Sequence, residues 1–427
     1  MRFVYCFVLP TLMFSLLCST DVHAQFWKRH KKKAHAGTIS TDKNKQQKQE
    51  LPKPHPLKKK YDFNYPASVI KKRYRIDVLI PLYLDDVNPD RPKMPEKAIS
   101  GMDFYQGVKI AIDTLNTFHY KLDVYVHDIT AAGSSLDVLI RNHSLDTADL
   151  IIGAVQAPQV PVLATFAKKK QINFISALSP SDGEVKDDPF FILLQPSLQA
   201  HCQWMVNTVA KKYYNKHTFL FYRTNTTVDK TAFGFLCPDT ADKTIPRLLC
   251  NTQPSKQQLA RLLDSTRINI IMMGIMDIAY ADVLLKQLYT QFPDYNFEVY
   301  GMPSWKNMAS LKKPEAYPNI GVNFTEPFSF DATTPMAQQI AAAYKKQWGG
   351  KPSELVYRGF ETTYWYAYML NQYGTIFNKK LSDNSAAPFT KFDVQPKWDK
   401  DYNLLYNENM HLYHFRYQGS SYIIDVN

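Results

Sequence analysis

The sequence has 427 residues, too many for one ordinary domain and about right for two lobes, and its 45% hydrophobic content allows a large core. The formal net charge of +12 suggests a nucleic-acid-binding protein, but residues 28–60 alone carry +10 and residues 1–27 are balanced. The remainder therefore carries only about +2. A basic segment is attached to a nearly neutral body, which argues against nucleic acid as a partner.

The N-terminal segment is typical of an export signal. Arg2 supplies a positive start, Phe3–Cys18 is apolar, and Val22–Ala24 has small residues at the two positions that a signal peptidase reads. The apolar stretch is shorter than the roughly 20 residues of a membrane-spanning helix. We predict that residues 1–24 are a signal peptide and that the protein acts in the periplasm or cell envelope. Lipid attachment at Cys18 is the alternative, which we disfavour.

A basic, disordered tether is predicted next, over residues 25–72. Its first part, residues 25–60, is rich in Lys, Gln, His and Pro and shows almost no apolar periodicity. Such a segment could contact an anionic surface of the envelope, or it could be a solvated spacer. The residues alone leave both interpretations open.

Strand-like and helix-like segments then alternate. Apolar runs predict strands at 75–82, 121–129, 150–152 and 172–175, and helical spacing predicts helices at 101–116, 134–144 and from about 156–161 onward. This alternation indicates a mostly parallel sheet with helices on both faces, and the nearly continuous apolar strands agree with burial on both sides.

A second α/β unit of similar style follows. Strands are expected at 217–222, 268–274 and 297–300, with helices at 198–213, 257–265 and 277–292, the last capped by Asp277. Two further helices are expected at 335–348 and about 358–373, separated by a Gly-Gly stop. The chain closes with a hairpin in which two strands flank residues 418–420.

Catalytic and metal motifs are not found. The sequence has no P-loop, Rossmann glycine fingerprint, nucleophile elbow, H-E-x-x-H or C-x-x-C. His411 and His414 would lie on opposite faces of a strand because their spacing is odd. We therefore expect a protein that is not an enzyme and that holds neither a metal nor a cofactor. Cys237 and Cys250 are candidates for a disulfide, with buried free thiols, Cys202 included, as the alternative.

The turn after Gly153 is a candidate ligand site. In open parallel sheets, ligands bind beyond the carboxyl ends of the strands, where helices present unpaired N–H groups. Gln156 and Ala157 would begin the following helix, and Ser176–Ser179 would form the turn after the next strand. An anion such as an amino-acid carboxylate could lie between the two turns. Ordinary connecting loops are the alternative.

Several segments together resemble the type 1 periplasmic binding proteins of the branched-chain amino-acid-binding kind. They occur in the order "IDVLIPLYL", "GMDFYQGVKIAIDTLN", "KLDVYVHD", "DLIIGAVQAPQVPVLATFAKKKQINFIS" and "FFILLQPSLQAHCQWMVNTVAKKY", followed by "MDIAYADVLLKQL" and "VYRGFETTYWYAYML". These segments are also similar to a cell-envelope subgroup of this family whose members are often fused to LysM modules, although no such module is evident in this sequence.

The resemblance implies two Rossmann-like α/β lobes with mostly parallel sheets, linked at a hinge by three crossovers, with ligand bound in the cleft between them. By that topology, residues 73–195 and 328–395 form the first lobe, and residues 196–327 and 396–427 form the second.

The resemblance also implies where ligand contacts lie. In the first lobe they correspond to Tyr83, Gln156, Ala157, Ala177 and Ser179. A hydroxyl that amino-acid binders place after the third strand is replaced here by the run Ala154–Ala157, and no acidic residue clearly matches the partner of a ligand's ammonium. In the second lobe, the residues that follow strands and are expected to face the cleft are Tyr222, Met276 and Trp305.

These inferences lead to an exported solute-binding protein. We expect it to capture a small polar or amphipathic ligand, amino-acid-like, with an ABC permease as a possible partner. The alternative is an envelope scaffold with a degenerate cleft that activates peptidoglycan synthesis by binding a cell-wall synthesis protein.

Overall fold

The computed structural model describes residues 63–90, 93–213, 216–237, 245–313, 316–418 and 421–425. The predicted signal peptide, Cys18 and residues 25–62 of the predicted tether lie outside the described residues. The tether was expected to reach residue 72, and this is wrong for its last part. Ser68 Oγ donates to the carbonyl of Tyr373 at 2.5 Å, and Lys71 pairs with Asp149 at 2.5 Å, so this stretch is held against the folded body.

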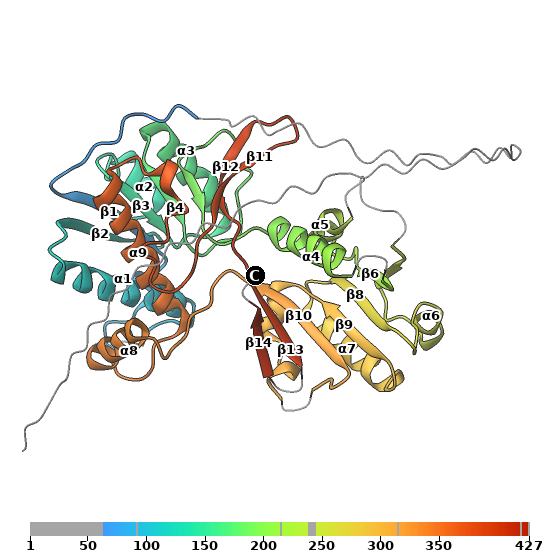
Figure 1. Cartoon of the computed structure of the whole chain (residues 1–427). Coiled ribbons are helices and arrows are strands. Elements are labelled where there is room, and N and C mark those ends of the chain that lie inside the picture. Colours follow the sequence, from blue (N-terminus) through green and yellow to red (C-terminus); the bar gives the residue numbers. More distant parts are fainter. Residues whose placement is uncertain are drawn as a thin grey trace, which may run out of the picture. The chain divides into compact units, whose positions relative to one another are not determined.

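The first sheet has seven strands in the order β11-β12-β5-β4-β3-β1-β2 (Figure 1). The strands are β1 (Tyr74–Ile80), β2 (Leu122–Asp128), β3 (Leu150–Gly153), β4 (Asn173–Ser176), β5 (Phe191–Leu193), β11 (Val394–Trp398) and β12 (Leu404–Asn409). All pairings are parallel except that of β11 with β12. The central strands β3, β4 and β5 are buried throughout, as their continuous apolar runs predict.

The second sheet has seven strands in the order β14-β13-β10-β9-β8-β6-β7. They are β6 (Thr218–Tyr222), β7 (Arg247–Leu249), β8 (Ile268–Gly274), β9 (Asn296–Tyr300), β10 (Ile320–Glu326), β13 (Tyr413–Gln418) and β14 (Ser421–Asp425). Strands β6 to β10 pair in parallel, and β13 is antiparallel to both β10 and β14. The predicted closing hairpin is therefore confirmed.

Helices connect the strands of each sheet. Those of the first lobe are α1 (Ile99–Thr117), α2 (Leu136–Arg141), α3 (Val160–Lys170), α8 (Pro335–Trp348) and α9 (Glu354–Tyr373), and those of the second lobe are α4 (Leu198–Lys212), α5 (Thr227–Leu236), α6 (Lys256–Ala260) and α7 (Ile278–Gln291). Asp277 caps α7, as predicted, because its carboxylate accepts from the backbone N–H of Tyr280 at 3.1 Å.

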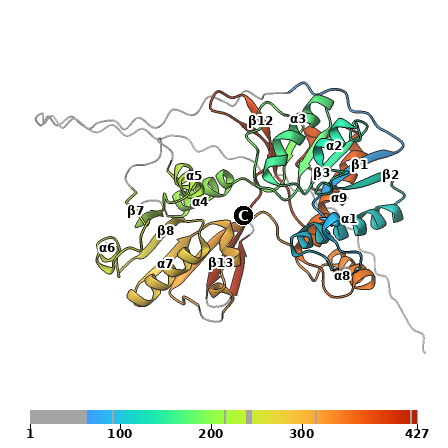
Figure 2. The same ribbon diagram turned by 180° about the vertical axis from the view of Figure 1, so that it is seen from behind.

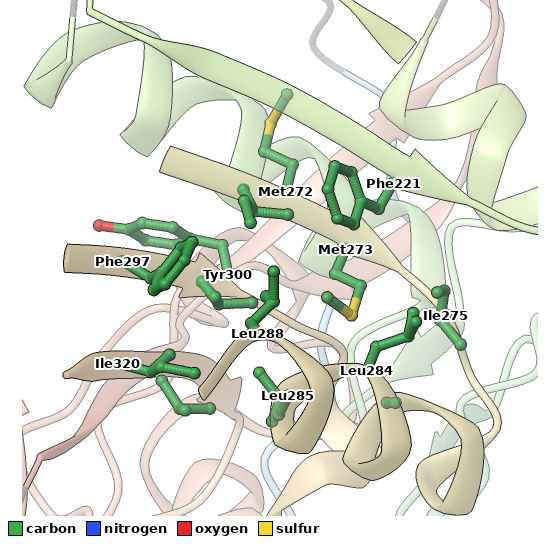
Figure 3. Packing of buried hydrophobic residues seen from close by; sticks show 14 of the residues in the cluster. Phe221, Met272, Met273, Ile275, Leu284, Leu285, Leu288, Phe297, Tyr300 and Ile320 are labelled. Carbon is green, nitrogen blue, oxygen red and sulfur yellow. The ribbon is translucent and has the colours of Figure 1, made fainter. Parts of the chain in front are cut away.

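The core of the second lobe forms around α7. Leu284, Leu285 and Leu288 of this helix belong to one buried cluster with Met273 and Ile320 of the sheet (Figure 3). Their spacing places them on one helix face, so the helix covers the sheet with a continuous apolar stripe.

Two glycines let α1 and α9 approach closely in the first lobe, where they lie side by side (Figures 1 and 2). A Cβ on Gly107 would lie 2.0 Å from the carbonyl oxygen of Val356, and one on Gly359 would lie 2.1 Å from that of Phe104. Larger residues at either position would force the helices apart. This contact sets the position of the first turns of α9, which contribute to the candidate site.

The chain passes between the two sheets three times, at residues 194–197, 327–334 and 410–412. The prediction of two α/β lobes with mostly parallel sheets joined by three crossovers is confirmed.

The predicted boundary between the lobes at residue 396 was wrong, because β11 and β12 join the first sheet through the parallel pairing of β12 with β5. Tyr406 of β12 is fully buried, with its ring centre 5.4 Å from that of Phe191 of β5, and a strand pattern alone does not assign it to either sheet. No helix in the described part of the chain is long and apolar enough to cross a membrane.

Candidate functional site

The turn after β1 holds Tyr83 in a left-handed backbone conformation, with φ 53° and ψ 40°. Such a conformation is uncommon for a residue with a side chain and needs support from its surroundings. Asp128, at the end of β2, supplies it by accepting from the backbone N–H groups of Leu82 and Leu84, each at 2.9 Å. Burial alone would raise the pKa of Asp128, but hydrogen bonds from Thr130 and from these backbone groups outweigh it and lower the pKa. The turn is therefore fixed by an ionised carboxylate.

The structure brings two predicted site residues together at this turn. Gln156 Nε2 donates to the Tyr83 hydroxyl at 3.2 Å. The backbone N–H of Gln156 is not free, because it donates to Gln159 Oε1 at 3.0 Å. Ala157 is exposed and begins a short 3-10 helix, Ala157–Gln159. Tyr83 and Gln156 contribute side-chain polar groups to this turn, and the backbone donor of Gln156 that the sequence suggested is already bonded.

The turn after β4 is bonded within the protein. The hydroxyl of Ser179 accepts from the backbone N–H of Ser181 at 3.2 Å. Ala177 is buried, and its carbonyl accepts from Arg358 at 3.3 Å. These residues lie at the predicted edge of the sheet, and they meet α9 there.

In the second lobe, Tyr222 and Met276 lie just beyond their strands. Tyr222 stacks on Phe233 with ring centroids 4.1 Å apart. The backbone N–H of Met276 donates to Asp229 at 3.4 Å, and its carbonyl accepts from the Ser304 hydroxyl at 3.4 Å. Both side chains are half-buried.

Trp305 does not face a cleft, contrary to the prediction from its position after β9. Its side chain is fully buried in the core of the second lobe, and its indole N–H donates to the carbonyl of Ile275 at 3.2 Å. The ring fills the space above Gly301, where a Cβ would lie only 2.2 Å from it. Position after a strand could not reveal this, because the chain folds back over the glycine.

The predicted disulfide is also wrong, because Cys237 and Cys250 are both free thiols, as is Cys202. Cys250 is buried in the core of the second lobe, with its thiol 3.5 Å from the carbonyl oxygen of Leu248. Burial raises the pKa of its thiol to about 12. Cys237 ends α5 and is half-buried. The thiols fill packing positions, which is the alternative that the odd cysteine count left open.

An arginine that belongs to none of the predicted site residues occupies the edge of the first sheet. Arg358, in the second turn of α9, donates from Nη2 to Gln195 Oε1 at 2.5 Å and to the carbonyl of Ala177 at 3.3 Å. Its guanidinium carbon lies 5.8 Å from the ring centre of Phe328. Within the described ranges Arg358 forms no ion pair, and both of its hydrogen-bond acceptors are neutral. Burial lowers the pKa of its guanidinium, although the carboxylates of Glu354, Glu326 and Glu361 act against this from beyond ion-pair distance. The sequence contained one signal of this site, namely a basic residue, Arg358, within a largely apolar helix.

A small cavity adjoins Arg358. It is lined by Leu194, Pro327, Phe328, Arg358, Glu361, Thr362 and Phe392, and its volume is about 10 Å³, room for roughly one water molecule. The Glu361 carboxylate is directed to the backbone N–H groups of Phe389 and Thr390 and to the Thr390 hydroxyl, at 3.2, 2.5 and 2.8 Å. Burial raises the pKa of Glu361 to about 7, against the effect of these bonds.

An ion-pair cluster links the second lobe to the start of α9. Lys306 follows β9, and its ammonium lies 2.5 Å from Glu354, at the N-terminus of α9, and 3.4 Å from Glu326, at the end of β10. Burial opposes protonation of Lys306, but the two carboxylates together raise its pKa. Burial raises the pKa of Glu326 to about 7, and the attraction of Lys306 offsets this only in part. Both carboxylates are thus already engaged by a cation.

These sheet orders and the three chain passages define the class: the chain has the type 1 periplasmic binding protein fold. A branched-chain amino acid ABC transporter protein from Rhodospirillum rubrum superposes with a TM-score of 0.61 at 10% identity, over 83% of this chain and 100% of that one. A branched-chain amino acid ABC transporter periplasmic ligand-binding protein from Burkholderia xenovorans gives 0.55 at 14% identity, over 83% and 95%.

A third similar structure is full-length LpoA from Haemophilus influenzae, with a TM-score of 0.55 at 12% identity. The match covers 85% of this chain but only 60% of LpoA. No protein-family model matches the sequence, and no curated protein matches it either. At these identities the likeness concerns the fold.

Proposed function

We propose that this chain is an exported solute-binding protein that captures a small polar or amphipathic ligand, amino-acid-like, between its two lobes. The observation that carries the proposal is Arg358, a half-buried guanidinium at the C-terminal edge of the first sheet whose only described acceptors are neutral. A cation in such a place is a ready partner for a polar ligand, and this edge is where open α/β sheets bind ligands.

Capture would use groups from both lobes. Tyr83, Gln156 and Arg358 belong to the first lobe, and Tyr222 and Met276 to the second. Closure would move the lobes about the three chain passages, as in other two-lobed binding proteins. The Lys306–Glu354 ion pair joins the second lobe to α9 and would respond to that movement. An ABC permease is the proposed recipient of the ligand.

The experiment is a thermal-shift screen of the full chain against neutral, zwitterionic, anionic and cationic small molecules. A ligand that binds only the folded state stabilises it by about 2.7 kcal/mol at one hundred times its Kd, and the shift grows with ligand concentration. A concentration-dependent shift with at least one compound supports the proposal. No shift with any compound in the four charge classes refutes it.

A scaffold in the cell envelope that activates peptidoglycan synthesis is the second candidate. This candidate is favoured because polar groups at the predicted ligand turns already form hydrogen bonds within the protein and are less available to a small ligand. Examples are the backbone N–H of Gln156 and the hydroxyl of Ser179. A scaffold would show direct binding to a purified peptidoglycan synthase in surface plasmon resonance and no small-molecule shift.

The basic segment is proposed to contact an anionic surface of the envelope. Deletion of residues 28–60 removes +10 of charge. If the segment is an anchor, the deletion should abolish co-sedimentation with phosphatidylglycerol vesicles at low salt. Unchanged sedimentation would make it a spacer.

A further inference from the structure

We propose that the N-terminal edge of the first sheet is a docking surface for an anionic lipid bilayer. The edge surface consists of the connections and strand starts that lead into β1 to β4, namely residues 63–73, 118–123, 141–149 and 168–172. This inference extends the contact proposed for residues 28–60 to the folded body, and its test separates the two contacts.

The four segments of the edge surface lie side by side. Strands β1, β2, β3 and β4 are parallel, so their N-terminal ends lie at one edge of the sheet, and β1 and β2 begin in register. Lys71 pairs with Asp149 at 2.5 Å, which joins the first segment to the third. Lys170, at the end of α3, pairs with Asp146 at 2.6 Å, which joins the fourth segment to the third. The edge surface is therefore continuous.

The edge surface carries a positive excess that the rest of the folded body lacks. It holds eight Lys or Arg and three Asp, a formal charge of +5, whereas residues 61–427 as a whole carry about +2. The three aspartates are all paired within the surface, including Asp123 with Arg73 at 2.7 Å, and Lys168 pairs with the neighbouring Asp187 at 3.0 Å. Four exposed cations have no ion-pair partner among the described residues, namely Lys72, Lys121, Arg141 and Lys169. An anionic surface would supply the missing partners.

Exposed apolar side chains lie among these cations. Val69 and Ile70 are 52% and 66% exposed, and Phe118, between α1 and β2, is 57% exposed. The carbonyl of Val69 accepts from the backbone N–H of Thr375 at 3.1 Å, so this segment is held against the body while its side chains face outward. Anionic headgroups attract cations, and the boundary between headgroups and acyl chains takes up apolar side chains. The combination favours a lipid bilayer as the partner.

The most basic part of the sequence leads into this surface. Residues 28–60 carry +10 and end shortly before Phe63, where the described chain begins. A tether bound to lipid would keep the edge surface close to the bilayer and raise the effective concentration for a second contact. Parallel strands run from this edge to the opposite one, where Tyr83, Gln156 and Arg358 lie. Docking would therefore direct the candidate ligand site away from the lipid.

The test measures how the exported chain, residues 25–427, partitions onto sedimented phosphatidylglycerol vesicles at low salt. The edge variant combines Lys72→Gln, Lys121→Gln and Lys169→Gln, which removes three unpaired cations. The matched control removes three exposed lysines of second-lobe helices that form no ion pair in the described chain, namely Lys211→Gln, Lys230→Gln and Lys286→Gln. We expect the partition coefficient to fall by about tenfold or more in the edge variant and by less than about twofold in the control.

Three results overturn the inference. Equal losses in the two variants would show that only net charge matters. Equal binding of the unaltered chain to phosphatidylcholine vesicles would show that anionic headgroups are not recognised. Unchanged partition of the edge variant, with binding lost on deletion of residues 28–60, would leave the tether contact standing and remove the edge surface.

Hydrogen exchange on the unaltered exported chain locates the contact without any substitution. Phosphatidylglycerol vesicles should protect the backbone amides of residues 68–73 and 118–122, and they should leave those of residues 251–256, in the second lobe, unchanged. Protection that is absent from the edge surface, or equal in the two regions, refutes the docking.

Discussion

Replacement of Glu361 by Gln removes a buried ionisable group without changing the shape of its side chain. Glu361 is 1% exposed and accepts hydrogen bonds from two backbone N–H groups and from the Thr390 hydroxyl. Gln retains an oxygen acceptor for the backbone groups, and its amide can donate to the hydroxyl oxygen. The main difference is therefore the negative charge that the wild-type protein must bury above neutral pH.

The magnitude follows from linkage. Burial raises the pKa of Glu361 from 4.5 to about 7, so the folded protein holds this proton at pH values where the unfolded chain has lost it. The stabilisation is complete below pH 4.5 and is lost as the pH rises to about 7. Between pH 5 and pH 8 the wild type should lose about 2 to 3 kcal/mol relative to Glu361→Gln, since one pKa unit corresponds to about 1.4 kcal/mol.

The assay is urea unfolding of both proteins at pH 5, 6, 7 and 8. The difference between them isolates Glu361, because other titrating groups, such as His201 and Glu326, contribute equally to both. Glu184→Gln, an exposed substitution of the same type, should show no pH-dependent difference. A difference between wild type and Glu361→Gln that stays constant from pH 5 to pH 8 would refute the reasoning.

Three further predictions concern the cores, the first turn and the thiols. Leu285→Ala opens a cavity in the second lobe and should lower the free energy of unfolding in urea by about 2 to 5 kcal/mol. The control Val283→Ala, at an exposed position of the same helix, should lower it by under about 0.5 kcal/mol. Equal losses for the two variants would contradict the packing described. Asp128→Asn replaces the ionised acceptor of two backbone N–H groups by a neutral amide and should lower the free energy of unfolding by about 1 to 3 kcal/mol. An unchanged free energy of unfolding would show that Asp128 does not hold the turn around Tyr83. The half-buried Cys237 should react with iodoacetamide in the native protein well before Cys250, because burial and a raised pKa protect the Cys250 thiol. Peptide mass spectrometry gives the order of labelling, and the reverse order would be inconsistent with the fold.

The regular elements could be predicted where the apolar period was long and uninterrupted. Helix α8 was predicted with its observed bounds, and α1 and α7 to within two residues at each end. Helix α5 and strand β10 were missed, although the second is buried along most of its length. Helix α6 ends at Ala260, whereas its pattern suggested a helix to residue 265. Short elements are decided by their neighbours more than by their own residues.

The candidate site was predictable in location and not in chemistry. Alternating strands and helices placed the turns after β3 and β4 at one sheet edge, which is where Gln156 and Ala177 lie. The residues alone could not show that Gln156 bonds to Tyr83, or that the carbonyl of Ala177 accepts from Arg358. These pairs are 73 and 181 positions apart in the chain, so only folding brings them into contact.

The sequence by itself determined the two α/β units and their mostly parallel sheets, because apolar periodicity and helix stops are local properties of a chain. Only the tertiary structure decided that β12 pairs with β5, that Trp305 fills the space above Gly301, and that Arg358 meets neutral acceptors at the edge of the first sheet. Each of these depends on which distant surface a segment packs against. That choice is made by burial and hydrogen bonding across the whole fold, which a local pattern does not contain.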